Sequence, residues 1–159
     1  MGRVIDLAET ARVRAEAKFA GRRVVFTNGY FDLLHVGHVR YLQAARALGD
    51  LLIVGVNNDA TARRFKGPGR PIISEDGRAE MVAALACVGW VVLFEEDTAQ
   101  RLVSILKPDV YAKGGDYDRA TLPEAPIVEA YGGQVVLLPY QTGHSTTAIV
   151  ETILERYRR

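Results

Sequence analysis

Residues 22–56, RRVVFTNGYFDLLHVGHVRYLQAARALGDLLIVGV, decide the fold. The short apolar run within residues 22–27 is typical of a parallel strand that is buried on both faces. A helix is expected over residues 36–48, because its apolar side chains recur on one stripe, and Gly49 suits a helix C-cap. Residues 51–56 then form a second strand of the buried type, so this stretch predicts a strand–helix–strand unit.

The same alternation continues to the end of the chain, interrupted by a polar stretch with Gly and Pro over residues 57–73. The expected strands cover residues 22–27, 51–56, 90–94, 110–112 and 135–138, and the expected helices cover residues 5–19, 36–48, 74–87, 98–107, 124–131 and 145 onward. Strands that alternate with helices favour right-handed crossovers and a parallel sheet. We therefore expect an α/β fold: a single Rossmann-like, doubly wound domain with a five-stranded parallel sheet and helices on both faces. Residues 1–21 are expected to form an N-terminal helical extension, and residues 22–159 the domain itself.

Composition and charge exclude several classes of protein. The chain has 159 residues, of which 48% are hydrophobic and 25% are charged, so a folded globular domain is expected rather than disorder. Twenty Lys and Arg face nineteen Asp and Glu, and the net charge of +1 leaves no basic footprint for nucleic acid or a membrane surface. No segment has the apolar character of a signal peptide or a membrane span, so a cytoplasmic protein is expected. The single cysteine, Cys87, lies in an apolar run and is expected to be a buried thiol.

The segment after the first strand contains two of the three histidines of the chain. Ligands of open parallel sheets bind beyond the carboxyl ends of the strands. His35 and His38 are three residues apart at an expected helix start, so their imidazoles point the same way. Gly29 and Gly37 allow close approach of the backbone to a ligand. Because a helix N-terminus offers unpaired N–H groups, this segment predicts a polyphosphate site; the alternative is a pair of surface histidines at a helix cap.

Several further positions are candidates, each with a plainer alternative. Lys66 and Arg70 lie in a Gly- and Pro-rich stretch, where a mobile cation can close over phosphates or be merely solvated. The third histidine, His144, precedes residues 145–147, whose hydroxyl groups can cap the last helix and also bind phosphate. Lys113 follows the fourth strand and either contacts a ligand or belongs to an ion pair with Asp116.

Polar residues near the other strand ends are further candidates. Asp32 suits a turn, and Asn57 and Asp59 suit the end of a strand, but their positions also favour contact with a nucleotide or metal. Arg78 lies inside an expected helix and is either a site residue or a surface charge.

The run of residues 29–38, GYFDLLHVGH, resembles the signature of the nucleotidyltransferase superfamily that carries the HxGH motif, which includes cytidylyltransferases, pantetheine-phosphate adenylyltransferase and FAD synthetases. The likeness extends from about residue 22 to residue 153. The runs KGGDY at 113–117 and FEEDT at 94–98 resemble the adenylyltransferase domain of heptose biosynthesis enzymes, which makes ADP-heptose from heptose 1-phosphate. Residues 140–143, YQTG, depart from the Arg-Thr-x-Gly run typical of cytidylyltransferases for glycerol phosphate or choline phosphate.

The resemblance implies roles for individual residues. His35, His38 and Lys66 would be catalytic, and Lys113, Asp116 and Arg78 would bind the second substrate. The residues implied in nucleotide binding are Asn28, Gly29, Tyr30, Phe31, Asp32, Gly37, Asn57, Asp59, Arg70, Gly114, Ser145, Thr146 and Thr147. No dedicated metal site is expected, and Mg²⁺ would be bound through the nucleotide phosphates.

The reaction implied is transfer of AMP from ATP to a sugar 1-phosphate with release of pyrophosphate. The attacking phosphate is already an anion, so alignment and charge stabilisation matter more than a general base. The resemblance also implies a homodimer. Heptose biosynthesis enzymes often carry a fused sugar kinase domain, and because residues 1–21 leave no room for one, a separate kinase is expected to supply the substrate. The alternatives are a cytidylyltransferase for a polyol phosphate, an FAD synthetase, and a nonenzymatic nucleotide-binding domain on the same fold.

Overall fold

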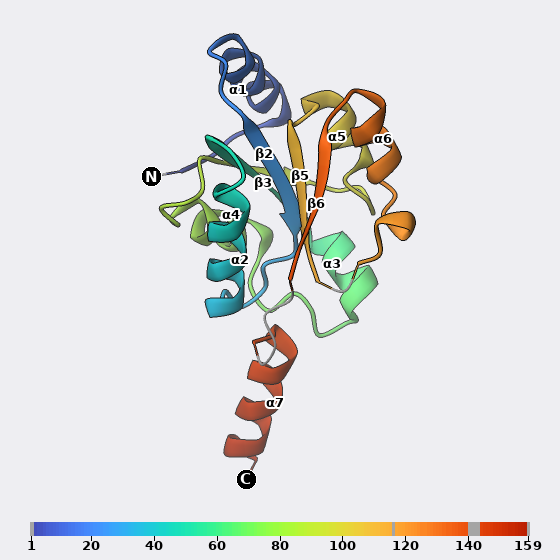
Figure 1. The fold of residues 1–159 in the computed structure, drawn as a ribbon. Coiled ribbons are helices and arrows are strands. Elements are labelled where there is room, and N and C mark those ends of the chain that lie inside the picture. The colour runs from blue at the N-terminus through green and yellow to red at the C-terminus, as the bar shows by residue number, and fades with distance from the viewer. Residues whose placement is uncertain (1, 116, 140–143, 159) are drawn as a thin grey trace.

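A computed structural model describes residues 2–115, 117–139 and 144–158. Its centre is one parallel sheet of six strands in the order β1-β4-β3-β2-β5-β6 (Figure 1). The strands are β1 (Arg3–Val4), β2 (Val24–Gly29), β3 (Leu51–Asn57), β4 (Trp90–Phe94), β5 (Val110–Gly114) and β6 (Gln134–Leu138). The helices are α1 (Leu7–Phe19), α2 (Val36–Arg46), α3 (Asp59–Lys66), α4 (Glu75–Ala83), α5 (Gln100–Leu106), α6 (Ala125–Ala130) and α7 (Thr146–Tyr157), with a 3-10 turn at Arg119–Thr121.

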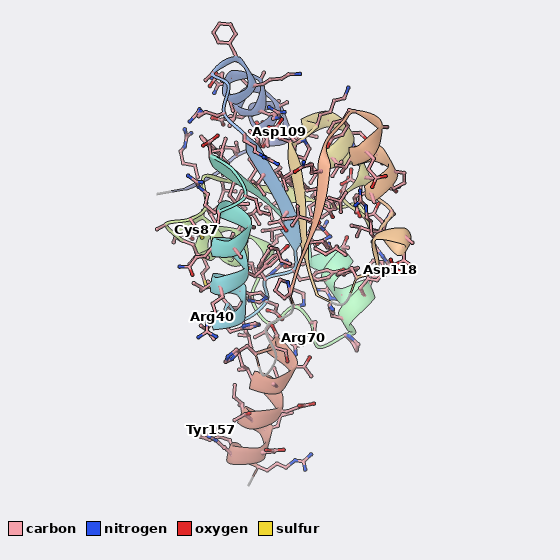
Figure 2. The ribbon with its side chains drawn as sticks, viewed as in Figure 1. Arg40, Arg70, Cys87, Asp109, Asp118 and Tyr157 are labelled. Atoms are coloured by element: carbon pink, nitrogen blue, oxygen red, sulfur yellow. The ribbon has the colours of Figure 1, made fainter. Side chains whose placement is uncertain are left out.

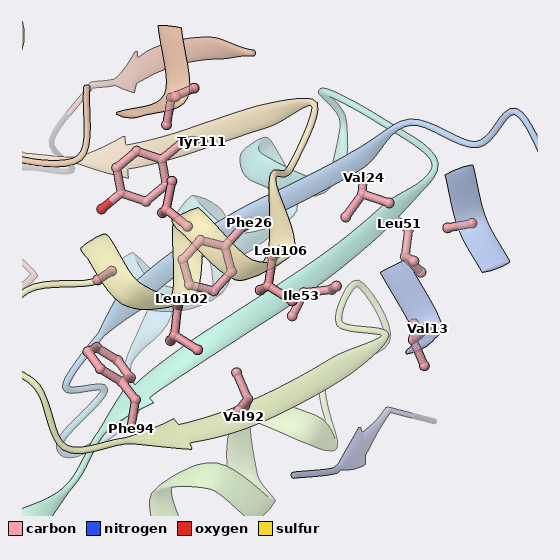
Figure 3. Packing of buried hydrophobic residues seen from close by; sticks show 14 of the residues in the cluster. Val13, Val24, Phe26, Leu51, Ile53, Val92, Phe94, Leu102, Leu106 and Tyr111 are labelled. Carbon is pink, nitrogen blue, oxygen red and sulfur yellow. The ribbon is translucent and has the colours of Figure 1, made fainter. Parts of the chain in front are cut away.

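The two faces of the sheet carry separate apolar clusters, because successive side chains of a strand point to opposite faces. On one face Phe26 of β2 and Tyr111 of β5 stack with ring centroids 5.9 Å apart, and α1, α5 and α6 cover them (Figure 3). On the other face Val25 and Val54 pack under α2 and α4 through Leu42 and other buried side chains. Both faces of β2 and β3 are therefore buried, as their apolar sequences predict.

The expected fold class is confirmed, but the sheet has one strand more than the five expected. The additional strand is β1, which pairs in parallel with β4 at the sheet edge. Two residues that include an exposed arginine are too short to show a period, so only the pairing with β4 identifies them as a strand.

Two further local differences concern the middle of the chain. Residues expected in an irregular stretch form α3, which is capped by the Asn58 side chain accepting from the Thr61 N–H at 2.9 Å. Cys87, labelled in Figure 2, is only partly buried, and burial raises the pKa of its thiol.

None of the described helices has both the length and the apolar character needed to cross a membrane.

Candidate functional site

The site lies where the order of the strands reverses. From β2 the chain proceeds to β3 and β4 on one side, and it then returns to form β5 and β6 on the other. Loops on the two sides of such a switch point diverge and leave a crevice at the carboxyl ends of the strands. A cavity of about 730 Å³ opens there, and segments from residue 28 to residue 147 line it.

Most of the predicted site residues meet at this cavity. Those that line it are Asn28, Gly29, Tyr30, Phe31, Asp32, His35, Gly37, His38, Asn57, Lys66, Arg70, Lys113, Gly114, Ser145, Thr146 and Thr147. Asp59 and Arg78 are not among the lining residues. Asp116 lies outside the described residues, and its predicted role stays a prediction.

The two histidines of the HxGH segment stack against each other at the start of α2, with ring centroids 3.8 Å apart and an interplanar angle of 24°. His35 is the N-cap, and its Nδ1 accepts a hydrogen bond from the Gly37 N–H at 3.1 Å. A neutral ring that accepts at Nδ1 carries its proton on Nε2. This geometry gives His35 one remaining donor beside the helix N-terminus.

His38 is held in a less polar environment. Its ring packs edge to face against Phe31, with ring centroids 5.3 Å apart. Burial is the main cause that lowers the pKa of His38 to about 4. The charge of His35 also lowers this pKa, and the charge of Asp32 opposes the change. The buried Nδ1 atom of His38 has no hydrogen-bond partner among the residues that the structure describes. His38 is therefore neutral near pH 7, and a buried polar atom in need of a partner suits a ligand-binding role.

Gly37 is required by the packing of these imidazoles. A Cβ atom at this position would lie 2.9 Å from the His35 ring and 3.1 Å from the Cβ of His144. A side chain at residue 37 would therefore push the histidines out of their stacked arrangement. The close approach predicted for this glycine is made by side chains of the site itself.

Asp32 organises the loop over the cavity. Its carboxylate accepts hydrogen bonds from the N–H groups of Ile72 and Ile73 at 3.0 and 3.1 Å, and from Arg70 at 3.0 Å. Burial raises the pKa of Asp32, but these donors outweigh burial and the net pKa lies below its usual value. The Asp32 carboxylate and the Arg70 guanidinium, both predicted to bind nucleotide, are thus engaged with each other.

The backbone around Asp32 is strained. Phe31 and Leu33 have φ angles of 52° and 48°, in the left-handed region that side chains other than glycine seldom adopt. Such strain persists only where surrounding contacts enforce it, and it concentrates at functional sites. One of these contacts is the Thr146 hydroxyl, which donates to the Asp32 carbonyl.

Arg78 lies beneath the cavity and cannot contact a ligand in it. The side chain is 0% exposed. It donates to the carbonyls of Ile73 at 3.0 Å and Asn57 at 2.8 Å, to the Tyr30 carbonyl, and to the Asp59 carboxylate at 2.7 Å. The predicted substrate contact of Arg78 is therefore wrong, because the side chain is fully buried and each of its three nitrogens is bonded to the loops after β2 and β3. The predicted nucleotide contact of Asp59 is likewise replaced by this ion pair.

Cations and a helix terminus face the cavity from other elements. Lys66 ends α3 and places its Nζ 5.3 Å from the centre of the Tyr30 ring. Ser145 is the N-cap of α7, and its hydroxyl accepts from the Ala148 N–H at 3.1 Å. The capping interpretation of Ser145 holds, and the first turn of α7 still presents backbone N–H groups at the cavity.

A partly buried amide joins the ends of β2 and β5. The Oδ1 atom of Asn28 accepts from the Tyr111 hydroxyl at 2.7 Å and from Lys113 Nζ at 3.1 Å. The Lys113 ammonium also lies 5.1 Å from the centre of the Tyr117 ring, and burial lowers its pKa, with a smaller opposing effect of Glu124. Lys113 is thus bonded to an amide. The alternative ion pair with Asp116 stays a prediction, because Asp116 lies outside the described residues.

Some lining residues were not anticipated from the sequence. They are Tyr41, Asp97, Thr98, Gly115, Tyr117, Leu122, Pro123, Glu124, Pro139 and His144. Asp97 and Thr98 lie in the loop after β4, which ends at Phe94, and could have been selected by the rule that ligands bind beyond the carboxyl ends of strands. Glu124 gives no such signal, because only the tertiary structure brings the start of α6 to the cavity.

No preformed metal centre is present in the described parts of the chain: no three His, Cys, Asp or Glu side chains gather as metal ligands would. The carboxylate of Asp32 is already occupied by N–H donors.

Comparison with known proteins agrees with this geometry. The sequence profile described as cytidylyltransferase-like matches residues 26–151. The bifunctional protein HldE of Trichlorobacter lovleyi is 56% identical over 147 residues, which are 92% of this chain and 30% of that protein. The protein of the same name from Pseudomonas aeruginosa is 52% identical over 153 residues, 96% of this chain and 32% of that protein. The chain thus spans about a third of the length of these relatives.

Two solved structures are also similar. A lipopolysaccharide core biosynthesis protein from Thermoplasma volcanium superposes with a TM-score of 0.63 and 32% identity, over 76% of this chain and 98% of that protein. Pantoate-beta-alanine ligase from Francisella tularensis superposes with a TM-score of 0.65 and 15% identity, over 100% of this chain and 80% of that one, and shows the fold alone. With the family profile matched from the first central strand to the last helix, the chain belongs to the cytidylyltransferase-like family.

Proposed function

We propose that this chain is an adenylyltransferase that transfers AMP from ATP to heptose 1-phosphate, releasing pyrophosphate and forming ADP-heptose. The observation that carries the proposal is the stacked His35–His38 pair at the mouth of α2, inside a cavity that Lys66 and the N-terminus of α7 also line. The relatives named HldE and the lipopolysaccharide core biosynthesis protein support the choice of a heptose acceptor.

In the proposed reaction an oxygen of the sugar phosphate attacks the α-phosphorus of ATP. The bond between the α-phosphorus and the bridging oxygen breaks, and pyrophosphate leaves in line with the attack. Because the nucleophile is an anion, the protein must mainly align two negatively charged groups and stabilise charge on the phosphoryl oxygens. A site of imidazoles, ammonium groups and helix N-termini meets that need.

Individual residues have distinct tasks in this proposal. His35 and His38 donate hydrogen bonds to the triphosphate, and Lys66 follows the charge that develops on the leaving group. The first turn of α7, with Ser145, Thr146 and Thr147, holds the β and γ phosphates. Mg²⁺ bound through the nucleotide phosphates would supply positive charge there, and it would need few protein ligands because it prefers water and phosphate oxygens.

The direct test is pyrophosphate release from each nucleoside triphosphate with a panel of sugar, polyol and flavin phosphates. We expect ATP with heptose 1-phosphate to give the highest kcat/KM. Preference for CTP with a polyol phosphate would identify a cytidylyltransferase, and preference for a flavin phosphate an FAD synthetase. Binding of ATP without pyrophosphate release from any pair would contradict an enzymatic role.

We further propose a cytoplasmic reaction in which a sugar kinase activity supplies the substrate, because the anomeric phosphate must first be transferred to the sugar. A homodimer is the proposed assembly. Figure 1 shows α7 extending away from the sheet, and Ile153, Leu154 and Tyr157 on it are 49%, 55% and 79% exposed, so a second copy could cover them. Light scattering would measure the molar mass in solution.

A further inference from the structure

One part of the cavity is built by residues that the proposed phosphate chemistry does not use. Glu124 immediately precedes α6, Leu122 and Pro123 come just before it, and Thr98 follows β4. Lys113 at the end of β5 lines the same cavity. This part combines a carboxylate, an ammonium group and apolar surface.

The Glu124 side chain is largely buried at the wall of the cavity. The residue is 3% exposed, and its Oε1 atom accepts a hydrogen bond from the Ala99 N–H at 2.7 Å. Within the described residues this carboxylate forms no ion pair with a lysine or arginine. An ionised carboxylate offers about four acceptor positions, so Glu124 can accept further hydrogen bonds besides the one from the Ala99 N–H. Hydroxyl groups of a ligand in the cavity could supply them.

The neighbours of Glu124 narrow the chemistry of that ligand. The carboxylate is close enough to raise the pKa of Tyr111, after the larger effect of burial, and to oppose the lowering of the Lys113 pKa. A quaternary ammonium or other cationic acceptor would be repelled by the Lys113 ammonium in the same part of the cavity. A polyol presents several hydroxyl donors and a phosphate for the ammonium.

We propose that Glu124 determines acceptor specificity by accepting hydrogen bonds from the hydroxyl groups of the sugar phosphate. The inference rests on the proposed function and adds to it a residue that selects the sugar through hydrogen bonds to its hydroxyl groups. Leu122 and Pro123 contact the C–H face of the same sugar, and Lys113 binds its phosphate. Glu124 takes no part in holding the triphosphate.

The first test substitutes Glu124→Gln, because the amide oxygen can still accept from the Ala99 N–H while the negative charge is lost. We expect KM for the sugar phosphate to rise about 10- to 100-fold, the effect of losing hydrogen bonds to a charged group. The Kd of ATP with Mg²⁺, measured by calorimetry, should stay within about twofold, since the phosphate-binding groups are untouched. The matched control is Glu129→Gln, an exposed carboxylate of α6 paired with Arg119, which should leave both constants unchanged.

A second test needs no variant. Sugar 1-phosphates that each lack one hydroxyl group are compared with the parent sugar on the unaltered protein. At least one deletion should lower kcat/KM about tenfold or more, because it leaves the Glu124 carboxylate without a donor. If Glu124→Gln folds, the same deletion should cost it markedly less.

The outcomes separate this inference from the proposed function. If the unaltered protein turns over no sugar phosphate, the proposed function fails. Suppose instead that the unaltered protein turns over the sugar phosphate. If Glu124→Gln then has the same KM for it, or if every deoxy sugar has a kcat/KM within about twofold of that of the complete sugar, Glu124 does not determine acceptor specificity. Loss of ATP affinity in Glu124→Gln equal to the loss for the sugar would likewise overturn the inference.

Discussion

His38 shows how one side chain is prepared for a ligand by its surroundings. The ring is stacked on His35, edged by Phe31 and left with a buried, unpartnered Nδ1 among the described residues. A neutral imidazole held in this way can donate one hydrogen bond to a phosphoryl oxygen with little reorganisation. The pair spacing in the sequence predicts the shared direction of the rings, whereas their low pKa values follow from burial in the folded protein.

The substitution His38→Ala is expected to lower kcat by on the order of a hundredfold or more, as loss of a donor to the transition state does. Steady-state pyrophosphate release measures the effect, and a thermal melt confirms that the variant is folded. Arg40→Ala, on the exposed outer side of the same helix (Figure 2), is the control and should retain parental kcat. Near-parental turnover in folded His38→Ala would remove His38 from the catalytic set.

At the scale of elements, two helix N-termini converge on the cavity. The first turns of α2 and α7 both line it, and the Asp32 loop links them through the Thr146 hydroxyl. Beneath them α4 contributes Arg78, which connects the loops after β2 and β3 to the helix. The arginine lies on the buried side of α4 with Ala79 and Val82.

We expect Arg78→Met to lower the free energy of unfolding by about 3 kcal/mol or more, because three carbonyls and the Asp59 carboxylate lose their donor. Arg78→Lys should rescue little, since one ammonium group cannot reproduce the geometry of the guanidinium. Urea denaturation measures both, with Arg40→Met as an exposed control. Parental stability of Arg78→Met would show that these hydrogen bonds contribute no net stability.

At the scale of the whole molecule, stability and site electrostatics are coupled through pH. The folded-state pKa of His38 is about 4, below its ordinary 6.5, so the unfolded chain binds a proton that the folded protein does not. His38 makes its full contribution to the free energy of unfolding above pH 6.5. This contribution falls as the pH drops from 6.5 to about 4, and it does not change further below pH 4. The shift corresponds to at most about 3 kcal/mol.

The experiment compares the free energy of unfolding of the parent protein and His38→Gln between pH 4 and 7. The parent should lose more stability than the variant across this window, because the variant has no imidazole at this position to protonate. The lowered pKa of His35 acts in the same direction in both proteins. Equal slopes for the two proteins would show that His38 titrates normally in the folded state.

The sequence by itself determined the alternation of strands and helices, the parallel sheet with two covered faces, and the HxGH segment at a strand exit. These features are encoded by neighbours in the chain: apolar runs, helical stripes, glycines and caps. Only the tertiary structure decided that Arg3–Val4 extends the sheet, that Arg78 lies under the cavity and that Glu124 lines it. Each of those outcomes depends on a contact between segments far apart in sequence, such as Glu124 with Ala99 or Arg78 with Tyr30. Burial and long-range hydrogen bonding leave no local period, so no window of the sequence could reveal them.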